Sequence, residues 1–329
     1  MFDWLLGKKS ESQLGIDLGS YSIKVVELGK KEERAYLANY ALAQAKGEAV
    51  FNVGELKEEE VAKILKDLLA RADVSSRRAN ISLSVEKTFS TVISMPAMPE
   101  QELNAAVSFE AQKYVPVPLE EVVLDWTVIS VESGQAKVGP KVTTDSIQGG
   151  AVGKAGAIEG VANIQVLLLA VPKETINRLT RIAKLAGLEV AALEQESFSL
   201  VRALVGNDKN TYMIIDCGRK GTDLIVVDQG FIKLSHNLES VNKEIILMEI
   251  DRIVNIFQMR YNRKVGQCLL AGGRAGGKDL LEFLSVKLRM PVKVGDPFAR
   301  VSKGIVPDNI LKELGPQFSV AVGLALREN

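Results

Sequence analysis

Short apolar runs alternate with longer stretches of helical periodicity along the chain, and this alternation is typical of an α/β protein. Near the amino end, residues 14–18 and 23–28 are apolar runs joined by a tight turn, so they predict two antiparallel strands. Residues 55–72 then place apolar side chains at helical spacing, which predicts a helix with one face in the core.

The opening pattern returns in the second half of the chain. Residues 212–218 are an apolar run that ends in glycine, and residues 222–227 resume β character after a turn. A third strand is expected over residues 231–237, followed by a long helix that Ser240 is expected to cap. Two similar halves of strands and helices predict an internal duplication.

Residues 94–171 interrupt the first half. A proline-containing turn precedes a helix expected over residues 99–113, and strands are expected over residues 122–131 and 164–171. Residues 133–160 are rich in glycine, serine, threonine and alanine, so they predict a loop between these strands, of unassigned role. The segment therefore predicts a small inserted α+β subdomain.

The composition excludes several classes of function. The 41 lysine and arginine residues balance 41 acidic residues, and without a net field a dedicated nucleic-acid binder is disfavoured. A single histidine, His236, and two cysteines exclude histidine-rich metal sites and cysteine-rich zinc modules. Two isolated cysteines suit a reducing compartment. No apolar run reaches the roughly 18 residues that a membrane span needs.

The amino-terminal stretch, residues 1–9, places its apolar side chains before its charges. A secretory signal has the opposite order. Two interpretations remain: a frayed tail with two hydrophobic anchors, Phe2 and Trp4, or a short segment that contacts a partner.

A duplicated motif carries the candidate chemistry. Asp17 and Gly19 end the first apolar run, and Asp216 and Gly218 end its counterpart, each pair entering a glycine turn. Consecutive turn amides form an anion-binding concavity, and glycine lets the backbone come close to a bound group. Two such hairpins facing each other predict a polyphosphate site that is gripped from both sides.

A third element completes the predicted site. Gly272 and Gly273 lie between a strand and a helix, where a loop without side chains can lie flat against a nucleobase or ribose. Asp17 and Asp216 are expected to hold Mg²⁺ through water, because Mg²⁺ dehydrates reluctantly. Lys24 can reach phosphate from the second strand, although a lysine there more commonly faces solvent. Each motif alone is typical of an ordinary turn, but the three in this order predict nucleotide binding. The predicted cofactor-binding residues are Asp17, Gly19, Ser20, Tyr21, Ser22, Lys24, Asp216, Gly218, Gly272 and Gly273.

This set of motifs resembles the superfamily of actin, heat-shock chaperones and sugar kinases. In that pattern, residues 15–28 correspond to the first phosphate hairpin, residues 214–227 to the second and residues 269–273 to the adenosine loop. Within the superfamily, the chain resembles the PilM family of type IV pilus assembly, itself similar to the division protein FtsA. The most specific similarity is the stretch over residues 109–126, FEAQKYVPVPLEEVVLDW, and residues 321–325 near the end fit as well.

The resemblance implies an α/β fold, the duplicated actin-like (ribonuclease-H-like) two-lobed fold with a small inserted α+β subdomain in the first lobe. The first lobe is expected over residues 1–93, completed by residues 172–206 and the carboxy-terminal helix at residues 315–329. The inserted subdomain is expected over residues 94–171, and the second lobe over residues 207–314.

The resemblance also implies a cytoplasmic adaptor, peripheral at the inner face of the inner membrane through protein partners, with ATP and Mg²⁺ as cofactors. Its expected partner is the amino-terminal cytoplasmic peptide of PilN, and through PilN the PilO–PilP complex. The pilus motor ATPase or platform protein is a further expected partner, nucleic acid is not, and self-association is open. The peptide groove is expected between the first lobe and the inserted subdomain.

The residues themselves support the peptide groove only in part. An apolar ledge is expected from Tyr114, Pro116, Pro118 and Trp126. The alternative is that these residues pack the inserted subdomain, and for Trp126 this alternative is favoured.

Hydrolysis requires a group that orients the attacking water. Glu194, Gln195 and Glu196 follow a strand where ATPases of this superfamily often place such a residue, and an acidic helix start is the alternative. Catalytic residues are unassigned, and ATPase activity is expected to be weak or absent.

Leu238 runs almost directly into the following helix, so the outer subdomain of the second lobe is expected to be trimmed, which weakens the exclusion of water. The alternatives are a scaffold of this fold that has lost nucleotide binding and an FtsA-like division or filament protein. An FtsA-like chain is disfavoured because no amphipathic helix follows the last core helix. A small-molecule kinase is also disfavoured, because no third functional aspartate emerges near either turn.

Overall fold

The computed structural model describes residues 12–32, 34–44, 53–132, 163–304 and 306–328. The chain divides into two compact units, a large one made of Met1–Phe89 and Val171–Asn329 and a small one made of Ser90–Ala170. The predicted amino-terminal segment, residues 1–9, and the predicted loop over residues 133–160 lie outside the described residues.

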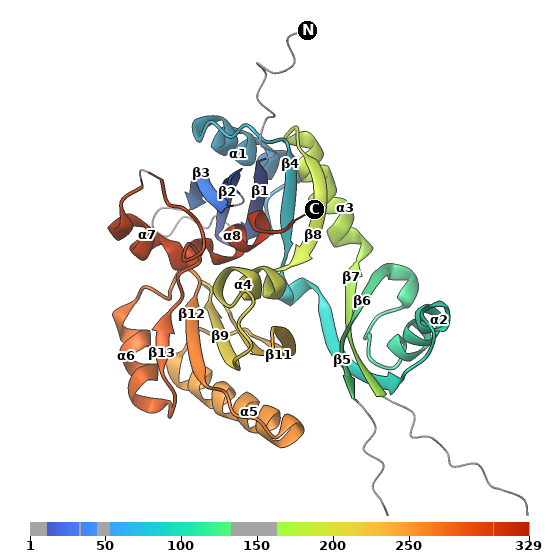
Figure 1. Ribbon diagram of the computed structural model, residues 1–329. Helices are drawn as coiled ribbons and strands as arrows, with labels where there is room; N and C mark the ends of the chain where they lie inside the picture. Colours follow the sequence, from blue (N-terminus) through green and yellow to red (C-terminus); the bar gives the residue numbers. More distant parts are fainter. Residues whose placement is uncertain (1–11, 33, 45–52, 133–162, 305, 329) are drawn as a thin grey trace, which may run out of the picture. The chain divides into compact units, whose positions relative to one another are not determined.

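The large unit contains two five-stranded sheets, and the first has the strand order β3-β2-β1-β4-β8 (Figure 1). The alternating apolar pattern of the amino-terminal residues forms an antiparallel meander, because tight turns join its strands, while the later strands pair in parallel after helical crossovers. The strands are β1 (Gln13–Gly19), β2 (Ser22–Lys31), β3 (Arg34–Gln44), β4 (Arg78–Leu83) and β8 (Glu189–Gln195).

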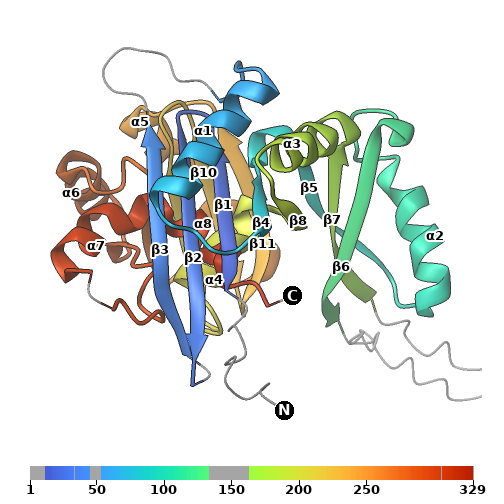
Figure 2. The same ribbon diagram turned by 90° about the horizontal axis from the view of Figure 1, so that it is seen from above.

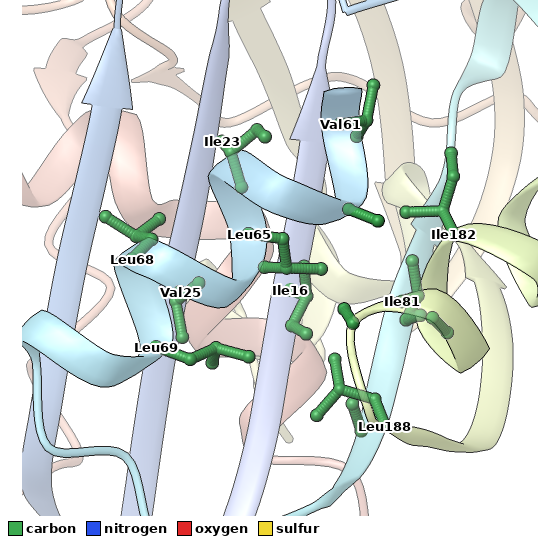
Figure 3. Close-up of a cluster of buried hydrophobic side chains, with 14 of the residues drawn as sticks. Ile16, Ile23, Val25, Val61, Leu65, Leu68, Leu69, Ile81, Ile182 and Leu188 are labelled. Carbon is green, nitrogen blue, oxygen red and sulfur yellow. The ribbon is translucent and has the colours of Figure 1, made fainter. Parts of the chain in front are cut away.

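Two helices, α1 (Glu58–Arg71) and α3 (Lys173–Leu185), cover one face of this sheet (Figure 2). The helical spacing of apolar residues in α1 points Val61, Leu65 and Leu69 at the sheet, where they meet Ile16 and Ile81 (Figure 3). Each such fully buried aliphatic side chain stabilises the fold by about 2 kcal/mol.

The second sheet repeats this architecture with the strand order β11-β10-β9-β12-β13. Its strands are β9 (Tyr212–Cys217), β10 (Thr222–Asp228), β11 (Phe231–Leu238), β12 (Gln267–Ala271) and β13 (Val292–Val294). Helices α5 (Lys243–Tyr261) and α6 (Lys278–Lys287) pack on it through an apolar cluster that includes Ile246, Ile250, Phe257 and Leu284. The duplication that the sequence predicts is therefore a duplicated sheet with a pair of helices packed on one of its faces.

The predicted cap of α5 is wrong. Asn242 is the N-cap, and its side chain accepts a hydrogen bond from the Ile245 amide at 3.0 Å. Ser240 lies two residues earlier, where its hydroxyl accepts a hydrogen bond from the Asn242 amide at 3.2 Å. Both residue types favour this position, and the path of the chain out of β11 decides between them.

Two further helices, α4 (Glu196–Leu204) and α8 (Ser319–Ala325), pack against each other, and α8 also contacts β1, β2 and β4. Every residue of α8 is buried. Helix α7 (Asp308–Leu314) and a short 3₁₀ turn, Gly315–Phe318, lead into α8. The carboxy-terminal helix is thus part of the core of the large unit (Figure 1).

In the residues that the structure describes, the small unit contains a three-stranded sheet with the order β5-β7-β6 and the helix α2 (Glu100–Ala111). Its strands are β5 (Phe89–Pro96), β6 (Val122–Glu132) and β7 (Asn163–Pro172). Trp126 donates a hydrogen bond from its indole nitrogen to Asn104 Oδ1 on α2 at 3.1 Å. This contact supports the packing interpretation for Trp126, not the ledge. Among the described helices, none is both long and apolar enough to cross a bilayer.

Candidate nucleotide site

One cavity of about 980 Å³ in the large unit is lined by both duplicated hairpins. The β1–β2 turn contributes residues 17–22 and Lys24, the β9–β10 turn contributes Asp216 and Gly218, and the loop after β12 contributes Gly272 and Gly273. All ten residues that the sequence predicts for cofactor binding therefore lie on the wall of the same cavity.

The first hairpin carries a buried ion pair. Asp17 and Lys24 are opposite each other in the β1–β2 register, and Lys24 Nζ lies 2.7 Å from Asp17 Oδ2. Ser82 of β4 donates a hydrogen bond to the other carboxylate oxygen at 3.1 Å. Burial alone would lower the pKa of Lys24, but the attraction of Asp17 outweighs it and raises that pKa. Lys24 is therefore a paired cation with only 12% of its side chain exposed, and the solvent-facing alternative is wrong.

The second hairpin places an acid where the first has its lysine. Asp223 is opposite Asp216 in the β9–β10 register, and it accepts a hydrogen bond from Asn237 Nδ2 at 2.8 Å. Burial, reinforced by Asp223, raises the pKa of Asp216 to about 7. Burial also raises the pKa of Asp223 to about 6. At pH values between the ordinary pKa of a carboxyl group and about 6, both aspartates favour the protonated form. The pair therefore favours a bound proton or a bound cation.

Gly272 is required by its surroundings. Its φ of +87° is in the left-handed region, and a Cβ there would lie 2.3 Å from Asp216 Oδ1 and 2.5 Å from the Cys217 carbonyl oxygen. A side chain would therefore displace a carboxylate of the cavity. The neighbouring Gly273 differs, because a Cβ on it would meet nothing within 4 Å.

Among the three residues considered for orienting water, only Glu196 lines the cavity. Burial, followed by the nearby charge of Asp17, raises the pKa of Glu196 well above its ordinary value. Glu194 instead binds two arginines outside the cavity, and Gln195 donates a hydrogen bond to Thr88 Oγ1 at 2.7 Å. Arg274 also lines the cavity, with its guanidinium hydrogen-bonded to the Val241 carbonyl at 2.9 Å.

The wall residues that sequence reasoning overlooked include Asp223, Arg219 and Lys220. Asp223 had a usable signal, because it occupies in the second hairpin the register position that Lys24 occupies in the first. The two basic residues occupy the tip of the second turn. Basic residues are also common in ordinary surface turns, so the sequence contains no signal that these two line a cavity.

The oxygen-rich wall suits a hard cation such as Mg²⁺. In the part of the chain that the structure describes, no three histidine, cysteine or acidic side chains are placed to hold a metal ion directly. A magnesium ion bound here would therefore keep water ligands and take others from phosphate, and Asp216 and Asp17 would hold it through those waters.

Two duplicated sheets, each opening with a hairpin that faces a common cavity, define a protein of the actin-like fold, as the sequence predicts. The sequence profile of the family described as "Type IV pilus assembly protein PilM" matches residues 15–140 and 234–329, more than half of the chain. The chain belongs to this family.

Solved structures show the same fold. The "PilM-PilN type IV pilus biogenesis complex" is 21% identical, with a TM-score of 0.77, over 97% of this chain and 98% of that chain. Ethanolamine utilization protein EutJ from Carboxydothermus hydrogenoformans is 14% identical, with a TM-score of 0.50, over 96% and 89%. The cytoplasmic domain of EpsL, an inner membrane component of the type II secretion system of Vibrio cholerae, is 10% identical, with a TM-score of 0.50, over 97% of each chain.

Proposed function

We propose that this chain is a cytoplasmic nucleotide-binding adaptor of type IV pilus assembly. In this proposal it binds Mg-ATP in the cavity and the amino-terminal cytoplasmic peptide of PilN on another surface. PilN would hold it at the inner face of the inner membrane and connect it to the PilO–PilP complex and the pilus motor. The observation that carries the nucleotide part is the single cavity lined by both hairpins and by Gly272–Gly273.

Different residues of the cavity wall would contact different parts of the bound Mg-ATP. The turn amides of the two hairpins supply donors for phosphate oxygens, and Lys24 supplies a buried positive charge beside them. The open side of Gly273 leaves room for a flat group to approach the backbone. Asp216 and Asp223 resist ionisation unless a cation is present, which favours the magnesium complex over the free nucleotide.

The same geometry supports binding with little turnover. Only residues 239–242 separate β11 from α5, which leaves no room there for an outer subdomain that closes over the ligand. A site that does not exclude water loses a large part of the electrostatic stabilisation that phosphoryl transfer depends on. We therefore propose a nucleotide-stabilised adaptor in preference to a fast ATPase.

Replacing Gly273 by leucine is expected to weaken Mg-ATP binding at least tenfold without changing the melting temperature. The new side chain starts in open space at the cavity wall, so it occupies ligand volume without pushing on the protein. Isothermal titration calorimetry measures the affinity, and a thermal melt of the same sample measures the stability.

Gly276→Leu is the matched control for this variant. Gly276 lies in the same loop but outside the cavity wall, and its nearest neighbour to a Cβ is the Glu313 carbonyl oxygen at 3.9 Å. Equal affinities for Gly273→Leu and Gly276→Leu would contradict the site. Wild-type protein that shows no heat with millimolar Mg-ATP would favour a scaffold that has lost nucleotide binding.

The partner-binding part of the proposal rests on family membership and on the surface of the small unit. Phe109 and Val117 are exposed there, and so is Tyr114, with 43% of its surface accessible. An extended peptide can bind such a ledge through alternate side chains. One similar structure is the PilM-PilN type IV pilus biogenesis complex, and we extend its PilN partner to the present chain.

The variant Tyr114→Ser is expected to weaken binding of a fluorescently labelled PilN amino-terminal peptide about tenfold, the effect typical of an aromatic anchor. Fluorescence anisotropy measures the affinity. Val286→Ser, which changes an apolar residue on α6 that is 81% exposed, serves as the control and is expected to leave the affinity unchanged. Unchanged binding by Tyr114→Ser would remove this ledge from the peptide site.

A further inference from the structure

Helix α5, orange in Figure 1, exposes apolar side chains on its outer face. Its inner face is held in the core of the second sheet by a row of buried residues: Ile246, Ile250, Ile253 and Phe257. The helix therefore cannot rotate to bury the outer face. Six exposed residues form that face, and together they are called the α5 stripe: Ile245, Met248, Arg252, Asn255, Ile256 and Met259.

The α5 stripe has the character of an interaction surface. Met259 is 87% exposed and Met248 is 66% exposed. Single exposed apolar residues are normal, but a continuous row at three- and four-residue spacing covers one side of a helix and marks a site of association. Methionine and arginine are enriched in protein interfaces, while lysine, aspartate and glutamate, which the stripe lacks, are depleted there.

The order of residues in the stripe is symmetric about Arg252. Met248 and Ile256 lie four residues to either side of it, and Ile245 and Met259 lie seven residues to either side. In an antiparallel pair of identical helices, a residue before the twofold axis faces the residue equally far behind the axis on the other copy. An axis at Arg252 therefore places Met248 against Ile256 of the second copy, and Ile245 against Met259 of the second copy.

The residue on this axis is the charged member of the stripe, and its charge is already balanced. Arg252 Nε lies 2.7 Å from Glu249 Oε2 on the preceding turn of the helix. Glu249 Oε2 also lies 3.6 Å from His236 Nε2 on β11, so the carboxylate is held from two sides. Two Arg252 side chains brought together at the axis therefore arrive with two carboxylates, which offset their repulsion.

We infer that the α5 stripe is the interface of a homodimer, in which two copies of α5 pack antiparallel about a twofold axis at Arg252. The symmetry of the stripe favours a second copy of this chain as the occupant, because an unrelated partner protein imposes no such order on the residues. The inference goes beyond the proposed function and does not depend on the nucleotide cavity. A contact made by one helix is at the small end of specific interfaces, so the expected dissociation constant is on the order of 10 µM.

The test is sedimentation equilibrium of the full chain. Ile245→Glu and Met259→Lys, made separately, are each expected to raise the dissociation constant of the dimer at least tenfold, because each buries a charge against an apolar side chain at two symmetric contacts. Both positions are exposed in the single chain, so the melting temperature of each variant is expected to stay within about 2 °C of the wild type.

An equimolar mixture of the two variants tests the register. In a mixed dimer, the carboxylate introduced at position 245 of one copy faces the ammonium group introduced at position 259 of the other, and the second contact keeps the native Met259 and Ile245. Dimerisation is expected to return to within about threefold of the wild type. The two positions lie about 21 Å apart along one helix, so the introduced charges cannot pair within a single chain.

Leu185→Lys is the matched control. Leu185 on α3 is 41% exposed, close to the 40% of Ile245, and it lies on a helix of the first sheet. Its dimer is expected to be as stable as that of the wild type.

Three results would overturn the inference. A wild-type chain that stays monomeric at about 100 µM would leave the stripe to a different protein. A dimer that persists in both single variants would place the contact on another surface. Single variants that are monomeric and stay so when mixed would exclude the antiparallel register about Arg252.

Discussion

Replacing Gly323 by alanine is expected to lower the free energy of unfolding by about 3 kcal/mol, at the upper end of the usual cost of overpacking. Helix propensity alone predicts the opposite, because alanine in a helix interior is favoured over glycine by about 1 kcal/mol. The clash decides the sign: a Cβ on Gly323 would lie 1.9 Å from the Ser199 carbonyl oxygen and 2.8 Å from the Ser199 Cα. These are backbone atoms of α4, so no rotamer change relieves the contact.

The clash at Gly323 affects other contacts as well, because α8 packs against β1 and β4 in addition to α4. On β1, a Cβ at Gly15 would lie 2.1 Å from the Ala321 carbonyl oxygen, so the helix also approaches the strand backbone closely. Asn80 of β4 donates a hydrogen bond to the Leu324 carbonyl at 3.0 Å. A shift of α8 away from α4 would therefore disturb these contacts as well.

Thermal unfolding of Gly323→Ala is expected to begin about 5 °C below that of the wild type, the size of shift that about 3 kcal/mol produces in a chain of this length. Gly273→Ala is the control, since a Cβ there meets nothing within 4 Å, and its melting temperature is expected to be unchanged. A Gly323→Ala variant as stable as the wild type would show that α8 and α4 are not in backbone contact.

The second large effect is expected for Glu194→Gln, which should lower the free energy of unfolding at pH 7 by about 3 kcal/mol. The Glu194 side chain, only 5% exposed, accepts hydrogen bonds from Ser199 Oγ at 2.6 Å, from both terminal nitrogens of Arg202, and from Arg327. Removing its charge leaves two arginines without their common carboxylate. Both arginines are about one-third exposed, so water solvates them in the variant. The expected loss is therefore at the lower end of the range for a broken buried ion pair.

This contribution depends on pH in a defined direction. Burial by itself would raise the pKa of Glu194, but the hydrogen bonds and charge of Arg202, with Ser199 and Arg327, outweigh it and hold that pKa below its ordinary value of 4.5. The folded state therefore binds this proton more weakly than the unfolded state. The stabilisation is present above pH 4.5 and is lost as the pH falls through the lowered pKa of the folded state.

Urea unfolding of wild type and Glu194→Gln at a series of pH values measures both the loss of unfolding free energy and its dependence on pH. The difference in free energy of unfolding between the two proteins is expected to be largest at pH 7. It is expected to shrink as the pH falls below 4.5, the ordinary pKa of glutamate. Glu189→Gln is the matched control on the same strand, because Glu189 is 76% exposed and its partner Arg78 lies 3.8 Å away. Its expected effect is below about 0.5 kcal/mol. An equal cost for the two variants would show that Glu194 contributes no more than a surface pair.

Several parts of this protein follow from its sequence alone. The period of apolar residues identifies the strands of both hairpins and the helix α1, because these patterns are local and each element buries one face. The glycines at the ends of β1, β9 and β12 identify the turns of the candidate site, because few other residues permit so close an approach of the backbone. Fold class and family are likewise confirmed, the fold class predicted from the two hairpins and the family most specifically from the continuous stretch over residues 109–126.

Only the tertiary structure decided which partners these residues meet. Lys24 is paired with a carboxylate because the register of β1 and β2 places it opposite Asp17. On the other sheet, burial raises the pKa of Asp216, and Asp223, opposite it in the register, adds to this shift. Glu194 was a candidate for orienting water until the docking of α4 and the carboxy-terminal segment gave it Arg202 and Arg327. Local periodicity determines which residues face a neighbour. The identity of that neighbour depends on how elements distant in the sequence pack, because burial and charge pairing act through space and not along the chain.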